Sequence, residues 1–199
     1  MAQTRRKKRR HAKSRHPFIK FLIIAGALVM VGCILCQSVY FVDRKIYPHE
    51  EYGEIIEKAA NTYNLEEPLI YAVINTESHF EPDAESGVGA KGLMQMMPST
   101  FEWLQNLRGE SYDEDSLFYP EINIDYGCYF LRYLIDMFGE ESTAVAAYNA
   151  GFAIVEEWLA NPEYSSDGKT LDTIPYPETD EYVKKVEKMK QEYIKRYYS

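Results

Sequence analysis

The chain has 199 residues and 46% hydrophobic content, which is enough for one globular domain with a packed core and too little for two large domains. Its formal net charge of -9 is unevenly spread, because nine of its 22 Lys and Arg residues fall within the first 20 positions. The other 13 stand against 31 acidic residues, the first of them Asp43, so the rest of the chain carries a net charge of -18. A domain this acidic repels phosphates, which argues against nucleic acid as its partner.

Residues 21–42 form an uncharged, apolar segment near the N-terminus. As a helix rising 1.5 Å per residue it would be roughly 33 Å long, enough to cross the ~30 Å hydrocarbon core of a bilayer. The basic run RRKKRR at 5–10 precedes it, and Tyr40 and Phe41 stand near its other end, where aromatic residues favour the membrane interface. The segment is therefore predicted to be a transmembrane helix.

The basic residues beside this segment set its predicted topology, because such residues stay on the cytoplasmic side of a membrane. We expect a basic cytoplasmic tail over 1–20, a single transmembrane anchor over 21–42 and an extracytoplasmic domain over 43–199, held at the cell membrane. Two alternatives involve cleavage: a signal peptide, whose apolar core usually has only about 7–15 residues, and a lipoprotein signal with 30–33 as an imperfect lipobox. The length of the apolar run favours the retained anchor.

Beyond the anchor, the apolar spacing predicts one helix after another, with breaks at Gly and Pro and no strong strand alternation. The predicted fold class is therefore mainly α. A first helix is expected over about 50–63, with Asn64 ending it in a left-handed conformation, and a second begins with Pro68 in its first turn. Residues 81–98 follow as a long connection with three glycines and two prolines, a length that usually marks a functional loop.

Ser99 or Thr100 is expected to begin the next helix, which is short. A longer helix is predicted from about 121 to 138, where apolar residues recur at spacings of four and three and so mark one buried face. Gly139 is expected to end this helix, since glycine readily adopts the left-handed conformation of a helix terminus.

Three further elements complete the predicted domain. Ser142 is expected to cap a short alanine-rich helix, and another short helix follows Gly151. Residues 161–177 contain three prolines and are predicted to form a surface loop with room for a short irregular hairpin. A last helix is expected from Asp180 to about Tyr197.

Glu77 is the most informative residue, because its spacing from apolar neighbours puts a carboxylate on the buried face of its own helix. It lies four residues after Val73 and eight after Leu69, at the C-terminal end of the helix. Burial and the negative end of the helix dipole both raise the pKa of a carboxyl group there. A carboxylic acid that is protonated near neutral pH can donate a proton to a glycosidic oxygen. A Glu at a helix end is more often solvated or paired with a cation, so its position alone does not decide the function.

Two later segments offer groups that could accompany such an acid. The glycines of the long loop allow a close approach of backbone to ligand, and Gln95 carries an amide that both donates and accepts. Met94 either contributes to a soft apolar surface or fills the core. In the run AAYNAG at 146–151, Tyr148 and Asn149 can bond to sugar hydroxyls or an acetamido group, although an Asn before a Gly is more often a helix stop.

Together, these motifs closely resemble the catalytic domain of the soluble-lytic-transglycosylase-like family, over almost all of residues 50–190. The resemblance is carried by an ordered set of short motifs: Glu77-Ser78, Gly92-Leu93-Met94-Gln95, Asn123-Ile124 with Gly127, Ala147-Tyr148-Asn149-Ala150-Gly151, Glu178-Thr179 and Tyr182-Val183. It implies a lysozyme-like fold for the domain that follows the transmembrane helix.

The resemblance also implies a chemistry, namely cleavage of the β-1,4 bond between N-acetylmuramic acid and N-acetylglucosamine in peptidoglycan glycan strands. A single carboxyl group, Glu77, would first protonate the glycosidic oxygen and then accept the proton of the C6 hydroxyl as it attacks C1. The product would carry a 1,6-anhydro-muramic end. The residues that the resemblance assigns to binding or orienting the substrate are Ser78, Met94, Gln95, Tyr148, Asn149 and Tyr182.

No second acid matches a motif position, although most glycoside hydrolases use two carboxylates. Asp83 and Glu85 are close in sequence, and we expect both to be solvated loop residues. Two rival functions stay open: a lysozyme-type muramidase of the same fold that uses water, and a catalytically silent cell-wall-binding protein.

No metal site or cofactor is expected, because the sequence has no H-E-x-x-H pattern and Cys128 is the only cysteine of the later domain. The expected partners are peptidoglycan glycan strands and, through the apolar segment, the membrane. We also expect a partner from the cell-wall machinery, not identified by the sequence, that restrains the activity.

Overall fold

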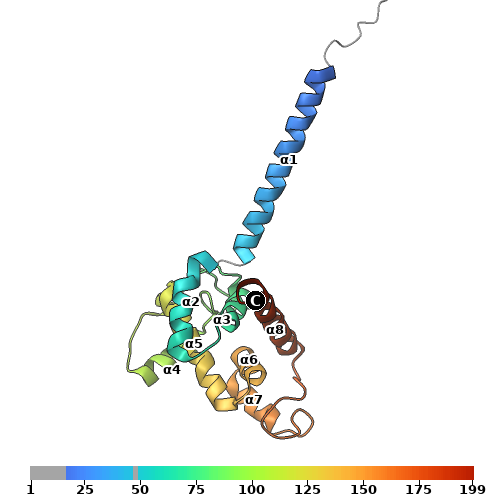
Figure 1. Ribbon diagram of the computed structural model, residues 1–199. Coiled ribbons are helices and arrows are strands. Elements are labelled where there is room, and N and C mark those ends of the chain that lie inside the picture. The colour runs from blue at the N-terminus through green and yellow to red at the C-terminus, as the bar shows by residue number, and fades with distance from the viewer. Residues whose placement is uncertain (1–16, 47–48) are drawn as a thin grey trace, which may run out of the picture. The chain divides into compact units, whose positions relative to one another are not determined.

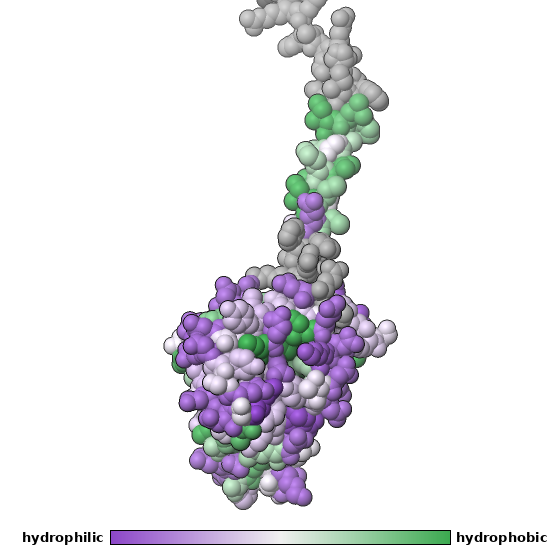
Figure 2. All heavy atoms as spheres, turned by 90° about the vertical axis from the view of Figure 1, so that its left-hand side faces the viewer, coloured by the Kyte–Doolittle hydropathy of each residue, from purple (hydrophilic) through white to green (hydrophobic). Residues whose placement is uncertain are grey.

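The computed structural model describes residues 17–46 and 49–199, and the chain divides into two compact units, Met1–Asp43 and Arg44–Ser199. Helix α1, Pro17–Ile46, accounts for the described part of the first unit (Figure 1). Its segment Phe21–Ser38 has a mean hydropathy of 2.3 and no buried residue, and it is the one helix among the described residues long and apolar enough to cross a membrane. Figure 2 shows hydrophobic side chains along it. Most of the predicted basic tail lies outside the described residues.

The second unit is helical, as predicted. Its helices in chain order are α2 (His49–Tyr63), α3 (Glu67–Ser78), α4 (Pro98–Arg108), the 3-10 helix η1 (Glu114–Phe118), α5 (Pro120–Phe138), α6 (Glu141–Ala150), α7 (Phe152–Leu159) and α8 (Pro177–Tyr197). The pairings of extended backbone within the described residues are two isolated antiparallel bridges in the long loop, which join Lys91 to Glu85 and to Met96. The mainly α prediction is therefore confirmed.

Several predicted helix ends are confirmed and others are wrong. Asn64 and Gly139 both adopt the left-handed conformation after their helices, and Pro68 lies in the first turn of α3. Helix α4 begins at Pro98, before the predicted Ser99, because proline's fixed φ suits the first helical position. For the same reason α8 begins three residues before Asp180.

The predicted cap at Ser142 is also wrong, because the carboxylate of Glu140 takes that role. Its oxygens accept hydrogen bonds from the backbone N–H of Ser142 and Thr143, so Ser142 lies inside the first turn of α6. The loop before α8 contains no paired strands in its described residues. Instead, the carbonyl of Tyr164 accepts backbone hydrogen bonds from residues 172 and 173. The 3-10 helix η1 was not predicted.

Helix α5 lies between two hydrophobic clusters and contributes to both. Toward α2, α3 and α8 it presents one set of fully buried side chains, Ile124, Cys128 and Leu131. Toward α4, α6 and α7 it presents a second set, Tyr126, Phe130 and Leu134. The single buried face predicted for this helix is thus only half of its packing. Helix α3 packs along α8, which brings the two segments that carry Glu77 and Tyr182 together.

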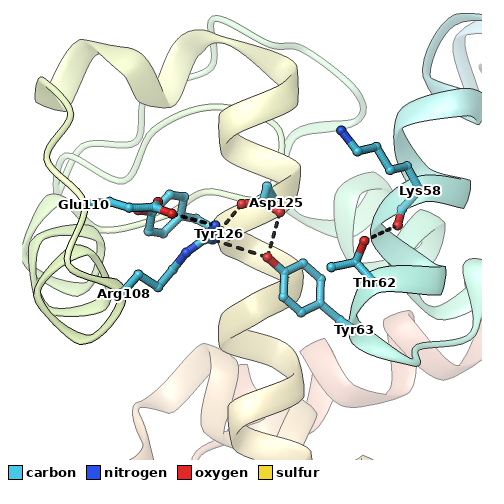
Figure 3. A network of polar contacts seen from close by, with 7 residues as sticks. All are labelled: Lys58, Thr62, Tyr63, Arg108, Glu110, Asp125 and Tyr126. Carbon is cyan, nitrogen blue, oxygen red and sulfur yellow. Dashed lines mark hydrogen bonds and ion pairs between the residues drawn. The ribbon is translucent and has the colours of Figure 1, made fainter.

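A polar cluster, here called the Asp125 cluster, joins α2, α4 and α5 (Figure 3). The Tyr63 hydroxyl donates to Asp125 Oδ1 at 2.6 Å, and Arg108 Nη1 donates to Asp125 Oδ2 at 2.6 Å. Arg108 also pairs with Glu110 at 3.1 Å and lies over the ring of Tyr126 at 4.5 Å. The Tyr126 hydroxyl donates to Glu110 at 2.5 Å, so each member of the cluster has at least one polar partner within it.

Candidate active site

Glu77 lies in the last turn of α3, where the buried face of the helix reaches the surface. The preceding residues from Leu69 to Ile74 are almost fully buried, whereas Glu77 itself is half-buried. The helix ends because His79 adopts a left-handed conformation with φ of 53°, and Phe80 follows at 63°. The buried Phe80 ring lies near Tyr52 and Tyr71, and this packing stabilises a turn that a non-glycine residue rarely adopts.

The Glu77 carboxyl group has a raised pKa and one hydrogen-bond partner. Desolvation raises its pKa from 4.5 to about 7, and the hydrogen bond from Tyr182 acts in the opposite direction. The Tyr182 hydroxyl donates to Glu77 Oε1 at 2.7 Å. Among the ion pairs of the described residues none involves Glu77, so no cation opposes the effect of burial. Burial thus shifts this pKa in the direction that the sequence predicts, and Asp83 and Glu85 are exposed, as expected.

Two tyrosines lie beside this carboxyl group. Desolvation and the charge of Glu77 hold the pKa values of both Tyr148 and Tyr182 well above 10, so both phenols stay neutral hydrogen-bond donors. The Tyr148 hydroxyl donates to the backbone carbonyl of Met94 at 2.8 Å, and this bond ties α6 to the long loop. Glu77 is thus flanked by neutral donors.

Ser78 and Gln95 are both bonded to the backbone around the G-L-M-Q motif. The Ser78 hydroxyl donates to Leu93 O at 2.7 Å, which joins the end of α3 to the loop. The amide nitrogen of Gln95 donates to the carbonyls of Ala84 and Gly92 at 3.1 and 3.0 Å. Because both N–H groups of this amide are used inside the loop, its Oε1 is the atom left to accept a bond from a ligand.

Met94 is a core residue of the loop. Its side chain is fully buried, and a Cβ atom at Gly127 would overlap it. Its backbone N–H donates to Asn123 Oδ1 at 2.7 Å, while its carbonyl accepts from Tyr148. Of the neighbouring methionines, Met96 is buried and Met97 is exposed. The side chain of Met94 therefore does not reach the surface, and its part in the site is to support the loop.

The loop is held by two polar side chains that do not touch Glu77. The buried amide of Asn123 donates to Lys91 O and Leu117 O at 2.9 and 2.8 Å, and a Cβ atom at Gly92 would overlap both it and Leu117. Lys91 has only 8% of its surface exposed, and its ammonium pairs with Glu114 at 2.5 Å. Nothing in the sequence marks Lys91 for this role, whereas Asn123 belongs to a predicted motif.

Asn149 is exposed and lies beside a cavity of about 510 Å³ that it shares with Tyr182. The end of α3, with Thr76 and His79, forms one wall of this cavity, and α8 forms another. Asn149 Oδ1 accepts a hydrogen bond from the hydroxyl of Thr179 at 2.8 Å. Thr179 was not among the predicted site residues, although it stands in the E-T-x-x-Y-V motif.

Of the predicted residues, Tyr182 contacts Glu77, Tyr148 lies close to it, Ser78 follows it in the chain and Met94 lies beneath the surface. Gln95 is bonded within the long loop, and Asn149 lines the cavity that Tyr182 borders. A carboxyl group with a pKa of about 7 is partly protonated at neutral pH, so it can give a proton and later take one back. No cluster of three or more His, Cys, Asp or Glu side chains that could hold a metal ion is present in the part of the chain that the structure describes.

Comparison with known proteins gives consistent matches. Residues 54–170 match the family described as the transglycosylase SLT domain. The soluble lytic murein transglycosylase of Salmonella typhimurium is 33% identical over 156 residues, which cover 71% of this chain and 24% of that protein. The membrane-bound lytic murein transglycosylase C of Histophilus somni is 36% identical over 119 residues, covering 53% of this chain and 32% of that protein. The chain thus spans about a quarter to a third of the length of these curated relatives.

Solved structures show the same likeness. An inactive mutant of the lytic transglycosylase Slt from Pseudomonas aeruginosa superposes with a TM-score of 0.68 and 32% identity, covering 81% of this chain and 27% of that one. The 70 kDa soluble lytic transglycosylase of Escherichia coli superposes with a TM-score of 0.66 and 30% identity, covering 72% of this chain and 24% of that one. The expected fold is therefore confirmed.

Proposed function

The chain belongs to the transglycosylase SLT domain family, and on that premise we propose that it cleaves peptidoglycan glycan strands as a lytic transglycosylase. The observation that carries the proposal is the Glu77 carboxyl group, half-buried without a cation, with a pKa of about 7 and a single phenol as its partner. The names of the similar proteins, which are murein transglycosylases, support the substrate class.

In the first step the protonated Glu77 donates its proton to the glycosidic oxygen between N-acetylmuramic acid and N-acetylglucosamine. The bond from C1 to that oxygen breaks, and the N-acetylglucosamine end leaves as an alcohol. The acetamido oxygen of the muramoyl residue stabilises the positive charge that develops at C1. The raised pKa supports this step, because it keeps a substantial fraction of Glu77 protonated at neutral pH.

In the second step the Glu77 carboxylate accepts the proton of the C6 hydroxyl, and the C6 oxygen forms the new bond to C1. The product ends in a 1,6-anhydro ring, Glu77 is protonated again, and no water is consumed. The hydrogen bond from Tyr182 supports this step, because it stabilises the charged form of Glu77 between the two proton transfers. One carboxyl group is thus sufficient for both transfers.

The remaining residues are proposed to place the strand against Glu77. Gln95 is half-buried with its Oε1 left to accept a hydrogen bond, and Asn149 is exposed, so that either is proposed to bind sugar hydroxyls or acetamido groups. Ser78 and Tyr148 fix the geometry of the loop and of the α3 end through their bonds to backbone carbonyls. Met94 contributes through its own backbone, which bonds to the side chains of Asn123 and Tyr148.

Mass spectrometry of digested peptidoglycan tests the proposal. We expect fragments with anhydro-muramic ends and no incorporation of oxygen from ¹⁸O-labelled water. Reducing ends, heavier by one water molecule and carrying the label, would instead assign the chain to the lysozyme-type muramidases. Binding to peptidoglycan without any cleavage would leave the cell-wall-binding function.

We also propose that α1 anchors the domain in the cell membrane with the N-terminus in the cytoplasm. The apolar segment Phe21–Ser38 and the basic residues before it support this placement.

The domain boundaries proposed are a tail over 1–20, the anchor over 21–42 and the catalytic domain over 43–199. We expect the full chain in the membrane fraction and a fragment from about residue 43 in solution, and external protease should digest only the C-terminal domain of intact protoplasts. Recovery of the fragment only as aggregate would contradict the boundary.

A further inference from the structure

A buried hydroxyl on α8 contacts the amide of Asn149 at the edge of the candidate site. Thr179 lies in the first turn of α8 and has only 2% of its surface exposed. Its Oγ1 donates to Asn149 Oδ1 at 2.8 Å. Asn149, by contrast, is exposed and comes from the end of α6, so the bond joins two helices that both border the cavity.

This hydrogen bond determines which way the Asn149 amide points. A buried hydroxyl hydrogen needs an acceptor, and in an amide only the oxygen accepts while the NH₂ group donates. A flipped amide would place its NH₂ group against Thr179 and remove the acceptor that the hydroxyl hydrogen has here. The NH₂ group of Asn149 therefore points away from Thr179, and Asn149 is exposed beside the cavity that it lines with Tyr182.

Tyr182 links Asn149 to the reacting group, because it borders the same cavity as Asn149 and donates its hydroxyl to Glu77 at 2.7 Å. A strand that lies against Glu77 and extends into this cavity would pass beside Asn149. The NH₂ group of Asn149 donates two hydrogen bonds and matches an oxygen acceptor, either the carbonyl of an acetamido group or a sugar hydroxyl.

We propose that Thr179 is a positioning residue for substrate binding, which holds the Asn149 amide with its NH₂ group toward an oxygen acceptor of the glycan strand. The inference rests on the proposed function, because it needs a glycan strand beside Glu77. Without the hydroxyl, the Asn149 amide populates both orientations. In the flipped orientation its Oδ1 faces an oxygen acceptor of the strand, and no hydrogen bond forms.

Substitution of Thr179 by Val tests the inference, since Val keeps the shape of Thr and lacks only the hydroxyl. We expect Thr179→Val to lower kcat/KM on soluble glycan strands roughly five- to tenfold, mainly through KM, as for the loss of about one hydrogen bond. Thr179→Ser keeps the hydroxyl and should stay within about twofold of the wild type.

Thr143 provides a matched control, because it is also a buried threonine, with 1% of its surface exposed. Its hydroxyl accepts a weak hydrogen bond from the backbone of Leu171 and does not line the cavity. Thr143→Val should therefore leave KM unchanged, even where it lowers the melting temperature as much as Thr179→Val does.

A double-mutant cycle with Asn149→Ala separates positioning from a general structural role. If Thr179 acts through Asn149, Thr179→Val should have no further effect on KM in the Asn149→Ala background. The inference is overturned if Thr179→Val binds like the wild type, if the Ser variant loses as much as the Val variant, or if the effects of the two substitutions simply add.

The cycle can be repeated by calorimetric binding of glycan strands to the Glu77→Gln protein, which needs no cleavage. If the wild type cleaves strands but Thr179→Val has the same KM and affinity as the wild type, only the positioning role is contradicted. A wild type that does not cleave, but whose affinity still depends on that hydroxyl, contradicts the proposed activity alone.

Discussion

Glu77 and Asp125 each accept a hydrogen bond from a tyrosine, and they differ in what else they touch. Asp125 accepts from Tyr63 at 2.6 Å through one oxygen and from Arg108 at 2.6 Å through the other (Figure 3). Glu77 accepts from Tyr182 at 2.7 Å, and its second oxygen has no bonded partner among the described residues. Asp125 is thus fully used in joining three helices, whereas Glu77 keeps one oxygen for a ligand.

The comparison teaches that the number of polar contacts is a poor guide to reactivity. The Asp125 cluster has more polar contacts, including an ion pair and a guanidinium stacked on Tyr126. However, each of its residues is bonded to another residue of the cluster. The simpler Glu77 environment combines desolvation with a single neutral donor, which leaves the carboxyl group able to change its protonation state near neutral pH.

The sharpest contrast is expected from removing the acid at Glu77. Glu77→Gln keeps size and polarity but cannot donate or accept the proton, so lysis should fall by at least about 10³-fold. The melting temperature should stay within a few degrees of the wild type. Release of soluble fragments from peptidoglycan and thermal unfolding measure the two effects. Undiminished lysis would remove Glu77 from its proposed role.

The pH dependence of stability should differ between the two carboxylates. Between pH 4.5 and about 7 the folded chain keeps a proton on Glu77 that the unfolded chain has lost, so this group's stabilising contribution disappears as the pH rises through 7. Relative to Glu77→Gln, the wild type should lose about 2–3 kcal/mol of unfolding free energy between pH 5 and pH 8. Urea unfolding of both proteins at several pH values gives the difference. Parallel curves would contradict the raised pKa.

Breaking the Asp125 cluster should affect stability and leave the chemistry intact. Asp125→Asn removes the ion pair with Arg108 and can place amide hydrogens against the Arg108 guanidinium. The substitution should lower the unfolding free energy by about 2 kcal/mol. Asp136→Asn is the matched control, because its exposed pair with Arg132 should contribute no more than about 0.5 kcal/mol. Both variants should retain wild-type kcat/KM. A lower kcat/KM in the refolded Asp125→Asn protein would show that the cluster is not purely structural.

The smallest expected effect comes from removing the Tyr182 hydroxyl, which donates a hydrogen bond to Glu77. Tyr182→Phe deletes a donor to the charged form, so the pKa of Glu77 should rise and the alkaline limb of the pH–rate profile should move to higher pH. Activity at the optimum should fall roughly fivefold. Tyr126→Phe removes an equivalent bond to Glu110 and should leave the profile in place. If the alkaline limb of the Tyr182→Phe profile moved to lower pH instead, Tyr182 could not be the donor that stabilises the charged form of Glu77.

The sequence was sufficient to predict the helices and the position of Glu77, because both depend on short-range spacing. Glu77 and its apolar neighbours share one helix, so a period of 3.6 residues places them on one face. The ordered motifs added the residues around it. The sequence left two places open for Met94, because a methionine in a loop suits either a surface or a core, and in the structure it fills the core.

The features that the sequence did not reveal depend on contacts between distant segments. The bond from Tyr182 to Glu77 joins residues 105 positions apart, and the one from Thr179 to Asn149 joins residues 30 apart. Contacts between residues this far apart in the chain leave no pattern in the local sequence. Helix α5 was predicted with one buried face because the spacing of four and three follows one row of apolar residues, whereas Tyr126, Phe130 and Leu134 form a second row at a spacing of four.

The shared position of α5 has a consequence for how the domain comes apart. Each hydrophobic cluster loses one wall if α5 leaves, so neither half of the domain has a complete core without the other. Opening is then cooperative across both clusters, and amide hydrogens in the middle of α5 are expected to exchange with solvent only through global unfolding. The helices that carry Glu77 and Asn149, α3 and α6, contribute buried residues to these clusters and are therefore held in place for as long as the domain stays folded.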